Sequence, residues 1–236
     1  MAGANTYAGG TTVSAGTLTG TSSSLQGDIT NSTTVVFDQA TTGTYAGNLS
    51  GSGALAKVGS GTVILAGVNT YSGPTTITAG TLSIAGDSSL GILPGSFTPG
   101  HLTLNGGTLA TTADFTLPSN RGLTFGTSGG TLEVASGTTL SFDQQIVSDF
   151  TKAGAGTLRL TTFAPLGQNK NVEIAAGTLL LDYSIPNSTF TIFNGTLSGA
   201  GNFALNLGTG SSVRQGNCCK KAINQSYESH LYVTQL

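Results

Sequence analysis

The sequence has few charged residues. Asp, Glu, Lys and Arg make up 8% of 236 residues, and the formal net charge is −2, whereas charged residues are usually about 25% of a soluble domain. Trp is absent, and Met occurs once, at position 1. A chain with so little positive charge offers no electrostatic basis for binding nucleic acid or an anionic membrane. Neither is predicted as a partner.

Long apolar runs are also missing. No run approaches the roughly 18 residues that a membrane helix needs, so no transmembrane segment is predicted in this chain. Residues 1–10, MAGANTYAGG, have neither the basic start nor the apolar stretch of a signal peptide. Met1 directly precedes a repeat unit that is already under way. We therefore expect a piece of a longer protein that lacks its own export signal.

Cysteine is confined to the C-terminal end. Residues 1–217 contain none. Cys218 and Cys219 are adjacent, and neighbours in sequence rarely meet the geometry of a mutual disulfide. A metal or redox site would need a second pair of ligands at suitable spacing, and only His230 is near. No metal site and no cofactor are predicted.

The acidic residues are scattered at about one per repeat, whereas β-helices that cleave polysaccharides need clustered carboxylates. The nearest pair is Asp143 and Asp149 in SFDQQIVSDF, six residues apart across an expected turn. His101 opens an expected strand and has no nucleophile motif beside it. No catalytic residue is predicted, and the protein is not expected to be an enzyme. Asp143 and Asp149 are kept as candidates for a polar groove.

Small and β-forming residues are abundant. Gly, Thr and Ser number 36, 39 and 25, which is 100 of the 236 residues. Aliphatic residues alternate with small polar ones in TVILAG (62–67), HLTLNGGTLA (101–110) and GTLRLTT (156–162). Alternation with a period of two is typical of strands with one buried face. With hydrophobic residues at 37%, this pattern favours a folded β protein over a disordered linker.

A Gly-Thr-Leu triplet, or a close variant, recurs along the chain, starting at Gly16, Gly61, Gly80, Gly107, Gly130, Gly156, Gly177 and Gly195. From Gly61 onward the intervals are 19, 27, 23, 26, 21 and 18 residues. Periods of this length without helical stripes indicate a β-solenoid, in which each coil pairs in parallel with the next. At about 22 residues a coil, residues 1–210 give roughly nine coils.

One segment of the sequence, called the repeated phrase below, occurs twice. Residues 5–18, NTYAGGTTVSAGTL, and residues 69–82, NTYSGPTTITAGTL, are identical at ten of fourteen positions. We predict that the repeated Asn shapes a corner by bonding its own local backbone, that the Tyr packs the corner with its hydroxyl in water, and that Gly allows the turn. Ile77 and Leu82 are expected to point inward, with Thr75 and Thr76 nearer the surface or at the entry to the strand. The structural repeat positions are Asn5, Tyr7, Gly9, Gly16, Asn69, Tyr71, Gly73 and Gly80.

Residues 211–236 do not continue the pattern. They hold both cysteines, one of the two histidines and three of the eight basic residues, and they contain no Gly-Thr-Leu. We predict two parts: residues 1–210 form the repeats, and residues 211–236 form an atypical tail, poorly ordered or aberrant in origin.

The phrase KVGSGTVILAGVNTYSGPTTITAGTLSIAG (57–86) resembles the passenger-associated repeat of bacterial autotransporters. Similar motifs follow in the same order, namely HLTLNGGTLAT, LPSNRGLTF, GGTLEVASGTTLSF and KAGAGTLRL. Lys57 and Lys152 occupy matching positions before Gly-x-Gly-Thr segments. The resemblance covers roughly residues 1–210. It implies a right-handed parallel β-helix in the exported passenger domain of a type V secretion system, secreted or displayed at the bacterial outer membrane.

The resemblance implies a structural or adhesive role, as a stalk or adhesin scaffold at the cell surface without catalysis. The partner would be a host-surface or glycan ligand, and the full-length protein would need a β-barrel translocator that this chain lacks. One alternative is a carbohydrate-binding or carbohydrate-processing β-helix that uses Tyr7, Tyr71, Asp143 and Asp149. Another is a truncated remnant without function, suggested by the tail. Self-association through the unpaired strand edges at the solenoid ends is also predicted.

Overall fold

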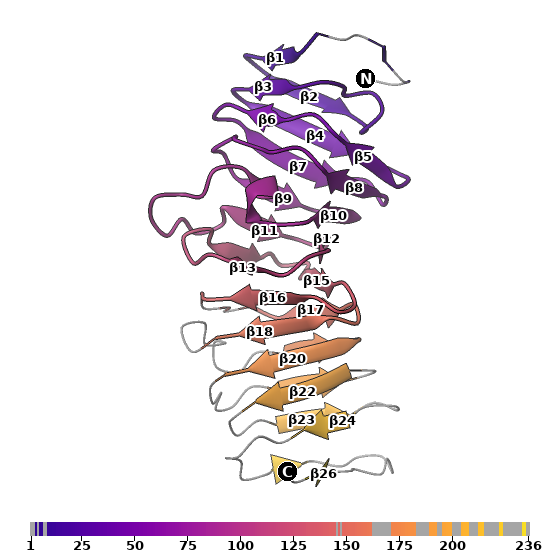
Figure 1. Cartoon of the computed structure of the whole chain (residues 1–236), viewed down its shortest axis with the longest axis vertical. Coiled ribbons are helices and arrows are strands. Elements are labelled where there is room, and N and C mark those ends of the chain that lie inside the picture. The colour runs from indigo at the N-terminus through magenta and orange to yellow at the C-terminus, as the bar shows by residue number, and fades with distance from the viewer. Residues whose placement is uncertain are drawn as a thin grey trace. The chain divides into compact units, whose positions relative to one another are not determined.

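The computed structural model describes residues 3, 5–6, 9–144, 146, 148–161, 171–182, 189–192, 195–199, 204–207, 212–214, 222–223 and 233–234. These residues form short parallel strands and one 3-10 helix, η1 (Asp87–Leu90) (Figure 1). The prediction of an all-β parallel solenoid of roughly nine coils is confirmed, with about eight turns. Within the described residues, no helix is long and apolar enough to cross a membrane.

The first compact unit comprises residues 1–112 and 120–130. Its strands pair in parallel in the orders β1-β3-β6, β14-β11-β9-β7-β4-β2 and β12-β10-β8-β5. The bounds are β1 (Thr11–Val13), β2 (Thr17–Gly20), β3 (Ile29–Asn31), β4 (Thr34–Asp38), β5 (Gly43–Tyr45), β6 (Leu49–Ser50), β7 (Ala54–Val58), β8 (Thr62–Leu65), β9 (Thr75–Ile77), β10 (Thr81–Ile84), β11 (Leu102–Leu104), β12 (Thr108–Thr111) and β14 (Leu123–Phe125). Each coil therefore contributes strands to different faces of the unit.

The second unit comprises residues 113–119 and 131–236. Its described strands pair in the orders β15-β17-β19-β21-β23-β25 and β13-β16-β18-β20-β22-β24-β26. The bounds are β13 (Phe115–Leu117), β15 (Thr131–Val134), β16 (Thr139–Phe142), β17 (Phe150–Ala153), β18 (Thr157–Leu160), β19 (Asn171–Ile174), β20 (Gly177–Leu181), β21 (Thr189–Ile192), β22 (Gly195–Gly199), β23 (Ala204–Leu207), β24 (Ser212–Arg214), β25 (Ala222–Ile223) and β26 (Val233–Thr234).

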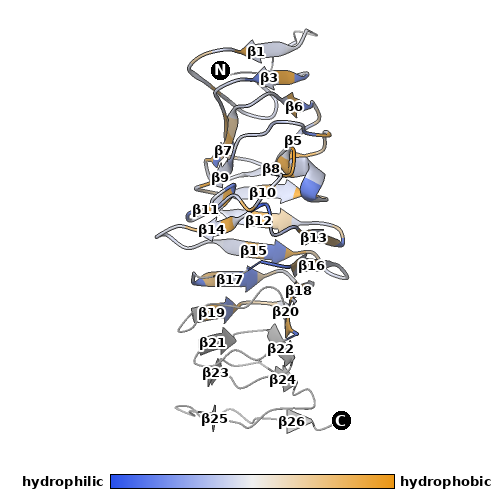
Figure 2. Ribbon diagram, turned by 90° about the vertical axis from the view of Figure 1, so that its left-hand side faces the viewer, coloured by the Kyte–Doolittle hydropathy of each residue, from blue (hydrophilic) through white to orange (hydrophobic). Residues whose placement is uncertain are grey.

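The Gly-Thr-Leu triplets set the register of the coils. Thr81 of β10 lies opposite Thr62 of β8 and Thr108 of β12, so the following aliphatic residues are also aligned. These residues form buried ladders, Val63, Leu82 and Leu109 in the first unit and Leu140, Leu158 and Leu179 in the second. Figure 2 shows that parts of β15 and β17 are hydrophilic (blue). The inward orientation predicted for Ile77 and Leu82 is confirmed.

The glycines of the repeated phrase differ in what they do. Gly16 and Gly80 have φ angles of 75° and 61°, which other residues rarely adopt. Gly73 is crowded instead, because a Cβ there would lie 2.4 Å from the carbonyl oxygen of Gly53 in the preceding coil. Gly9 is exposed, and a Cβ there would meet nothing within 4 Å. Three of the four predicted glycines therefore have a backbone or packing reason to lack a side chain.

The C-terminal segment contains three of these short strands. β24 pairs with β22, β25 with β23 and β26 with β24, all in parallel. Most other residues of 211–236, including Cys218, Cys219 and His230, lie outside the described residues. The predicted boundary near residue 210 and the aberrant tail therefore stay predictions. So does association through the ends, where β1, β2 and β5 are the outermost strands of their sheets.

Candidate functional site

The repeated asparagine bonds neighbouring coils. Asn69 Oδ1 accepts the backbone N–H of Leu49 from the coil before, at 2.8 Å, and its Nδ2 donates to the carbonyl of Ser89 in the coil after, at 2.7 Å. At the equivalent position, Asn5 Nδ2 donates to the carbonyl of Ser24 at 2.6 Å. The predicted bond of Asn69 to its own local backbone is wrong, because both partners are 20 residues away in the chain. The predicted corner position stays a prediction. Asn69 is buried, and its two side-chain bonds are to the coils before and after it.

Replacing Asn69 by alanine should lower the free energy of unfolding by about 2 kcal/mol, because a buried N–H and a buried C=O both lose their side-chain partner. Asn48 is the matched control, since it is exposed and its Oδ1 accepts the backbone N–H of Val68. Asn48→Ala should cost less than about 1 kcal/mol. Chemical denaturation of both variants measures the difference. Equal losses in the free energy of unfolding would show that the buried hydrogen bonds of Asn69 stabilise the fold no more than the exposed hydrogen bond of Asn48 does.

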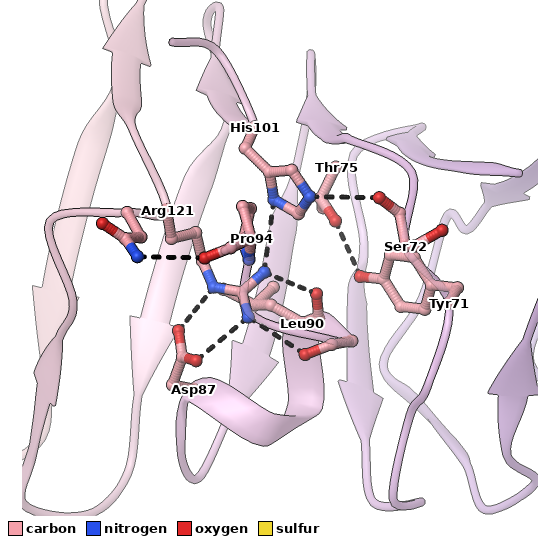
Figure 3. A network of polar contacts seen from close by, with 10 residues as sticks. Tyr71, Ser72, Thr75, Asp87, Leu90, Pro94, His101 and Arg121 are labelled. Carbon is pink, nitrogen blue, oxygen red and sulfur yellow. Dashed lines mark hydrogen bonds and ion pairs between the residues drawn. The ribbon is translucent and has the colours of Figure 1, made fainter. Parts of the chain in front are cut away.

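Tyr71 is a buried corner residue. Its side chain is 1% exposed, and its hydroxyl shares a hydrogen bond of 2.7 Å with Thr75 Oγ1 (Figure 3). Burial raises the pKa of the phenol well above its usual range. The predicted packing role is therefore right, and the predicted wet hydroxyl is wrong. A ring so deeply buried is not a platform for stacking a sugar. Tyr7 lies outside the described residues.

Two lysines are buried in matching cages of carbonyl groups. Lys57 Nζ donates to the carbonyls of Val58 at 2.6 Å, Gly59 at 2.8 Å and Ala79 at 3.2 Å. The first two belong to its own coil, and Ala79 belongs to the next. An ammonium group has three N–H donors, so the cage uses all of them. Both lysine side chains are fully buried.

Lys152 repeats this geometry in the second unit. Its Nζ donates to the carbonyls of Ala153 at 2.7 Å, Gly154 at 2.7 Å and Ala176 at 3.1 Å. Burial lowers the pKa of Lys152 to about 8, partly offset by the nearby Glu133. Burial lowers the pKa of Lys57 too, partly offset by Asp38. The matching places noted in the sequence are therefore matching cross-links between coils.

The surface feature most unlike the rest of the described chain is the loop of residues 91–100, GILPGSFTPG, called the apolar loop below. It leaves the coil after η1 and returns at β11, and it carries no charged residue (Figure 1). Its exposed large side chains are Ile92 at 53%, Leu93 at 39% and Phe97 at 59%. Outside this loop, the described chain has one other exposed large hydrophobic residue, Val68 at 69%.

The base of the apolar loop is held by one buried arginine. Arg121 Nε and Nη2 donate to the two carboxylate oxygens of Asp87. Nη1 donates to the carbonyl of Leu90 at 2.8 Å, and Nη2 donates to that of Gly91 at 3.0 Å (Figure 3). The fifth N–H, on Nη1, points to His101 Nδ1 at 3.3 Å. All five guanidinium donors are therefore used, and the side chain is fully buried.

Further bonds fix the path of the loop. The N–H of Ile92 donates to the carbonyl of Tyr71 at 2.9 Å, and the N–H of Thr98 donates to the carbonyl of Asn120 at 3.1 Å. Asn120 Nδ2 donates to the carbonyl of Pro94 at 3.0 Å. The loop is therefore anchored at its start, middle and end. Its apolar side chains are exposed on a preorganised backbone.

Asp143 and Asp149 are not brought into an acidic cluster. Asp143 is half-buried, with Oδ1 shielded from solvent and lacking a hydrogen-bond partner, whereas Asp149 is exposed. In the described part of the chain, no group of three or more His, Cys, Asp or Glu side chains is placed to hold a metal ion. The polar groove and the carbohydrate alternative stay predictions.

The Asp87, His101 and Arg121 cluster was not found from the sequence. Arg121 and Asp87 are 34 residues apart, and neither lies in a recognisable motif. His101 was placed correctly at the start of a strand, directly before β11. The one usable signal was compositional: Asp87 and Arg121 are two of the few charged residues in a chain with 8% charged residues.

The sequence matches the family model of the passenger-associated-transport-repeat over residues 1–19, 55–84 and 150–181. The second match contains Lys57 with its three carbonyl partners, and the third contains Lys152 with its own. The chain therefore carries passenger-associated repeats of autotransporters, and the resemblance noted in the sequence is confirmed.

Among curated proteins, the chain is similar to the adhesin BmaC autotransporter of Brucella suis biovar 1 (strain 1330). The two are 42% identical over 139 residues, which is 56% of this chain. The chain spans about 4% of the length of that relative. No solved structure matches the chain.

Proposed function

We propose that the chain is a segment of a surface-exposed autotransporter passenger that takes part in adhesion. In this proposal the parallel solenoid acts as the stalk, and the apolar loop makes contact with a host surface. The proposal is supported by the passenger-associated repeats and by the similarity to a protein named as an adhesin. No catalytic role is proposed.

The observation that carries the proposal is the concentration of exposed apolar area on one anchored loop. Ile92, Leu93 and Phe97 project from ten uncharged residues, while the strands around them present mainly Thr, Ser and Gly. Exposed apolar clusters commonly mark interaction sites, and a preorganised loop loses little entropy on binding. Each such side chain contributes about 1.5–3 kcal/mol when it is fully buried.

The proposal predicts that Ile92→Ser, Leu93→Ser and Phe97→Ser together reduce binding of the labelled chain to cultured epithelial cells at least about tenfold. Flow cytometry over a range of protein concentrations measures the bound amount. Val68→Ser is the control, because it removes a similarly exposed apolar side chain outside the loop, and it should bind as the wild type does. Unchanged binding by the triple variant would refute the role of the loop.

A further inference from the structure

His101 has its protonation state dictated by its neighbours. Arginine can only donate hydrogen bonds, so His101 Nδ1, at 3.3 Å from Arg121 Nη1, must be without hydrogen. Nε2 then carries the hydrogen and donates to the carbonyl of Ser72, also at 3.3 Å. Both ring nitrogens are thereby satisfied only in the neutral Nε2–H tautomer (Figure 3). The side chain is buried, so water does not offer an alternative partner.

A second proton on His101 does not fit this arrangement. It would sit on Nδ1 and face an N–H of Arg121, replacing a hydrogen bond by contact between two cations. The charged groups that face the ring are Arg121, from the segment before β14, and Asp87, from η1. Asp87 already takes two N–H groups of Arg121. The buried group of three would therefore change from net neutral to net positive, which is costly in a desolvated site.

We propose that His101 is a proton-sensitive latch for the apolar loop. Protonation displaces Arg121 from the carbonyls of Leu90 and Gly91, and the loop detaches from the coil. Ile92, Leu93 and Phe97 then lose their fixed presentation. The consequence for adhesion rests on the proposed function, but the opening of the loop does not.

The direction of the pH effect follows from the environment of the ring. Burial lowers the pKa of His101 below its ordinary value. The Ser72 carbonyl and Asp87 raise the pKa and partly offset this effect, while Arg121 lowers it further. A detached histidine titrates near about 6.5. Between the lowered value and about 6.5, the detached form binds a proton that the closed form does not. The closed loop is therefore fully stable above about pH 6.5 and loses stability as the pH falls, by up to about tenfold in the closed-to-open ratio per pH unit.

Hydrogen exchange between pH 7.5 and 4.5 tests the latch. The protection factors of the Ile92 and Thr98 amides should fall by up to about tenfold per unit once the pH drops below about 6. The amide of Ala175, which donates to the Lys152 carbonyl in the second unit, should keep its protection. His101→Gln should make the Ile92 and Thr98 protection independent of pH in this range. The chain has two histidines, so His230→Gln is a matched control that should retain the wild-type profile.

Nitrogen NMR of the two histidine side chains gives a second measurement, which does not require His101→Gln to fold. It should find His101 as the Nε2–H tautomer with a pKa below about 6.5. A Nδ1–H tautomer, a pKa at or above that value, or pH-independent protection in the wild type would each overturn the latch. If the protection of the Ile92 and Thr98 amides did not depend on pH, while the triple loop variant bound cells less than the wild type, the latch alone would be refuted. If this protection fell with pH as expected, while the triple loop variant bound cells as the wild type does, the proposed function alone would be refuted.

Discussion

Replacing Lys152 by methionine will lower the free energy of unfolding by about 3 kcal/mol. Methionine fills a similar volume without donors, so the carbonyls of Ala153, Gly154 and Ala176 all lose the ammonium. Removing the cost of burying a charge offsets part of this loss. For a chain of this length, the melting temperature should fall by about 6–12 °C. Lys57→Met should behave alike, because its cage has the same geometry.

The control for the lysine cage is Arg159→Met. Arg159 pairs with Asp182 at 2.8 Å, but its side chain is 49% exposed, and such surface pairs contribute less than about 1 kcal/mol.

The pH dependence of stability gives a second test of the buried lysine. Because the folded pKa of Lys152 is about 8 against an ordinary 10.5, unfolding takes up a proton between these values. Stability should rise with pH across that window in the wild type, relative to Lys152→Met. A parallel pH dependence of the two proteins would contradict the lowered pKa of Lys152.

Replacing Arg121 by methionine will have the largest effect, about 4 kcal/mol. The substitution leaves Asp87 without its cation and strips the donors from the Leu90 and Gly91 carbonyls and from His101 Nδ1. Asp87 stays 21% exposed in its side chain, so some water reaches it and limits the loss. The apolar loop should lose its anchor as well. Calorimetry measures the stability, and hydrogen exchange at Ile92 and Thr98 measures the loop.

Arg159→Met serves again as the control, since it also removes an arginine that pairs with an aspartate, but at the surface. It should leave exchange at Ile92 and Thr98 unchanged. If Arg121→Met lowered overall stability while these amides stayed protected, the arginine would support the coil and not the loop. If neither changed, the buried network would be energetically neutral.

The coil and its core could be predicted because stacking makes them periodic. Ile77 and Leu82 are fully buried, as alternation indicated. Of the two places expected for Thr75, the structure has the entry to the strand, since Thr75 is the first residue of β9. It is two residues from Ile77 on that strand and shares its inward face, so it is not at the surface. At 1% exposure, its hydroxyl is satisfied by Tyr71.

The cross-links between coils could be located from the sequence but not understood from it. The recurrence of Asn5 with Asn69, and of Lys57 with Lys152, was visible. Their partners are backbone groups about one coil away. Almost every residue type has the same backbone N–H and C=O groups, so the sequence does not show which of them are bonded. A repeated polar residue in a solenoid therefore indicates a ladder as readily as a turn.

The anchor of the apolar loop could not be predicted for another reason. The loop lies in an insertion that interrupts the repeat, so neither periodicity nor the repeated phrase bears on it. Asp87 and Arg121 meet only because two successive coils pack together. The fully used guanidinium group is a result of that packing. Its only advance signal was the rarity of charge in the chain.

The lysine cage also sets how such a chain can lengthen. Each cage takes carbonyls from a lysine's own coil and from the next, 22 residues on for Lys57 and 24 for Lys152. Duplicating residues 55–84 or 150–181 would copy the lysine together with all three of its carbonyl acceptors. Each of these segments, at about 30 residues, is longer than one coil and contains a complete cage. Loops that enter outside these segments, as the apolar loop does, therefore leave the cages intact.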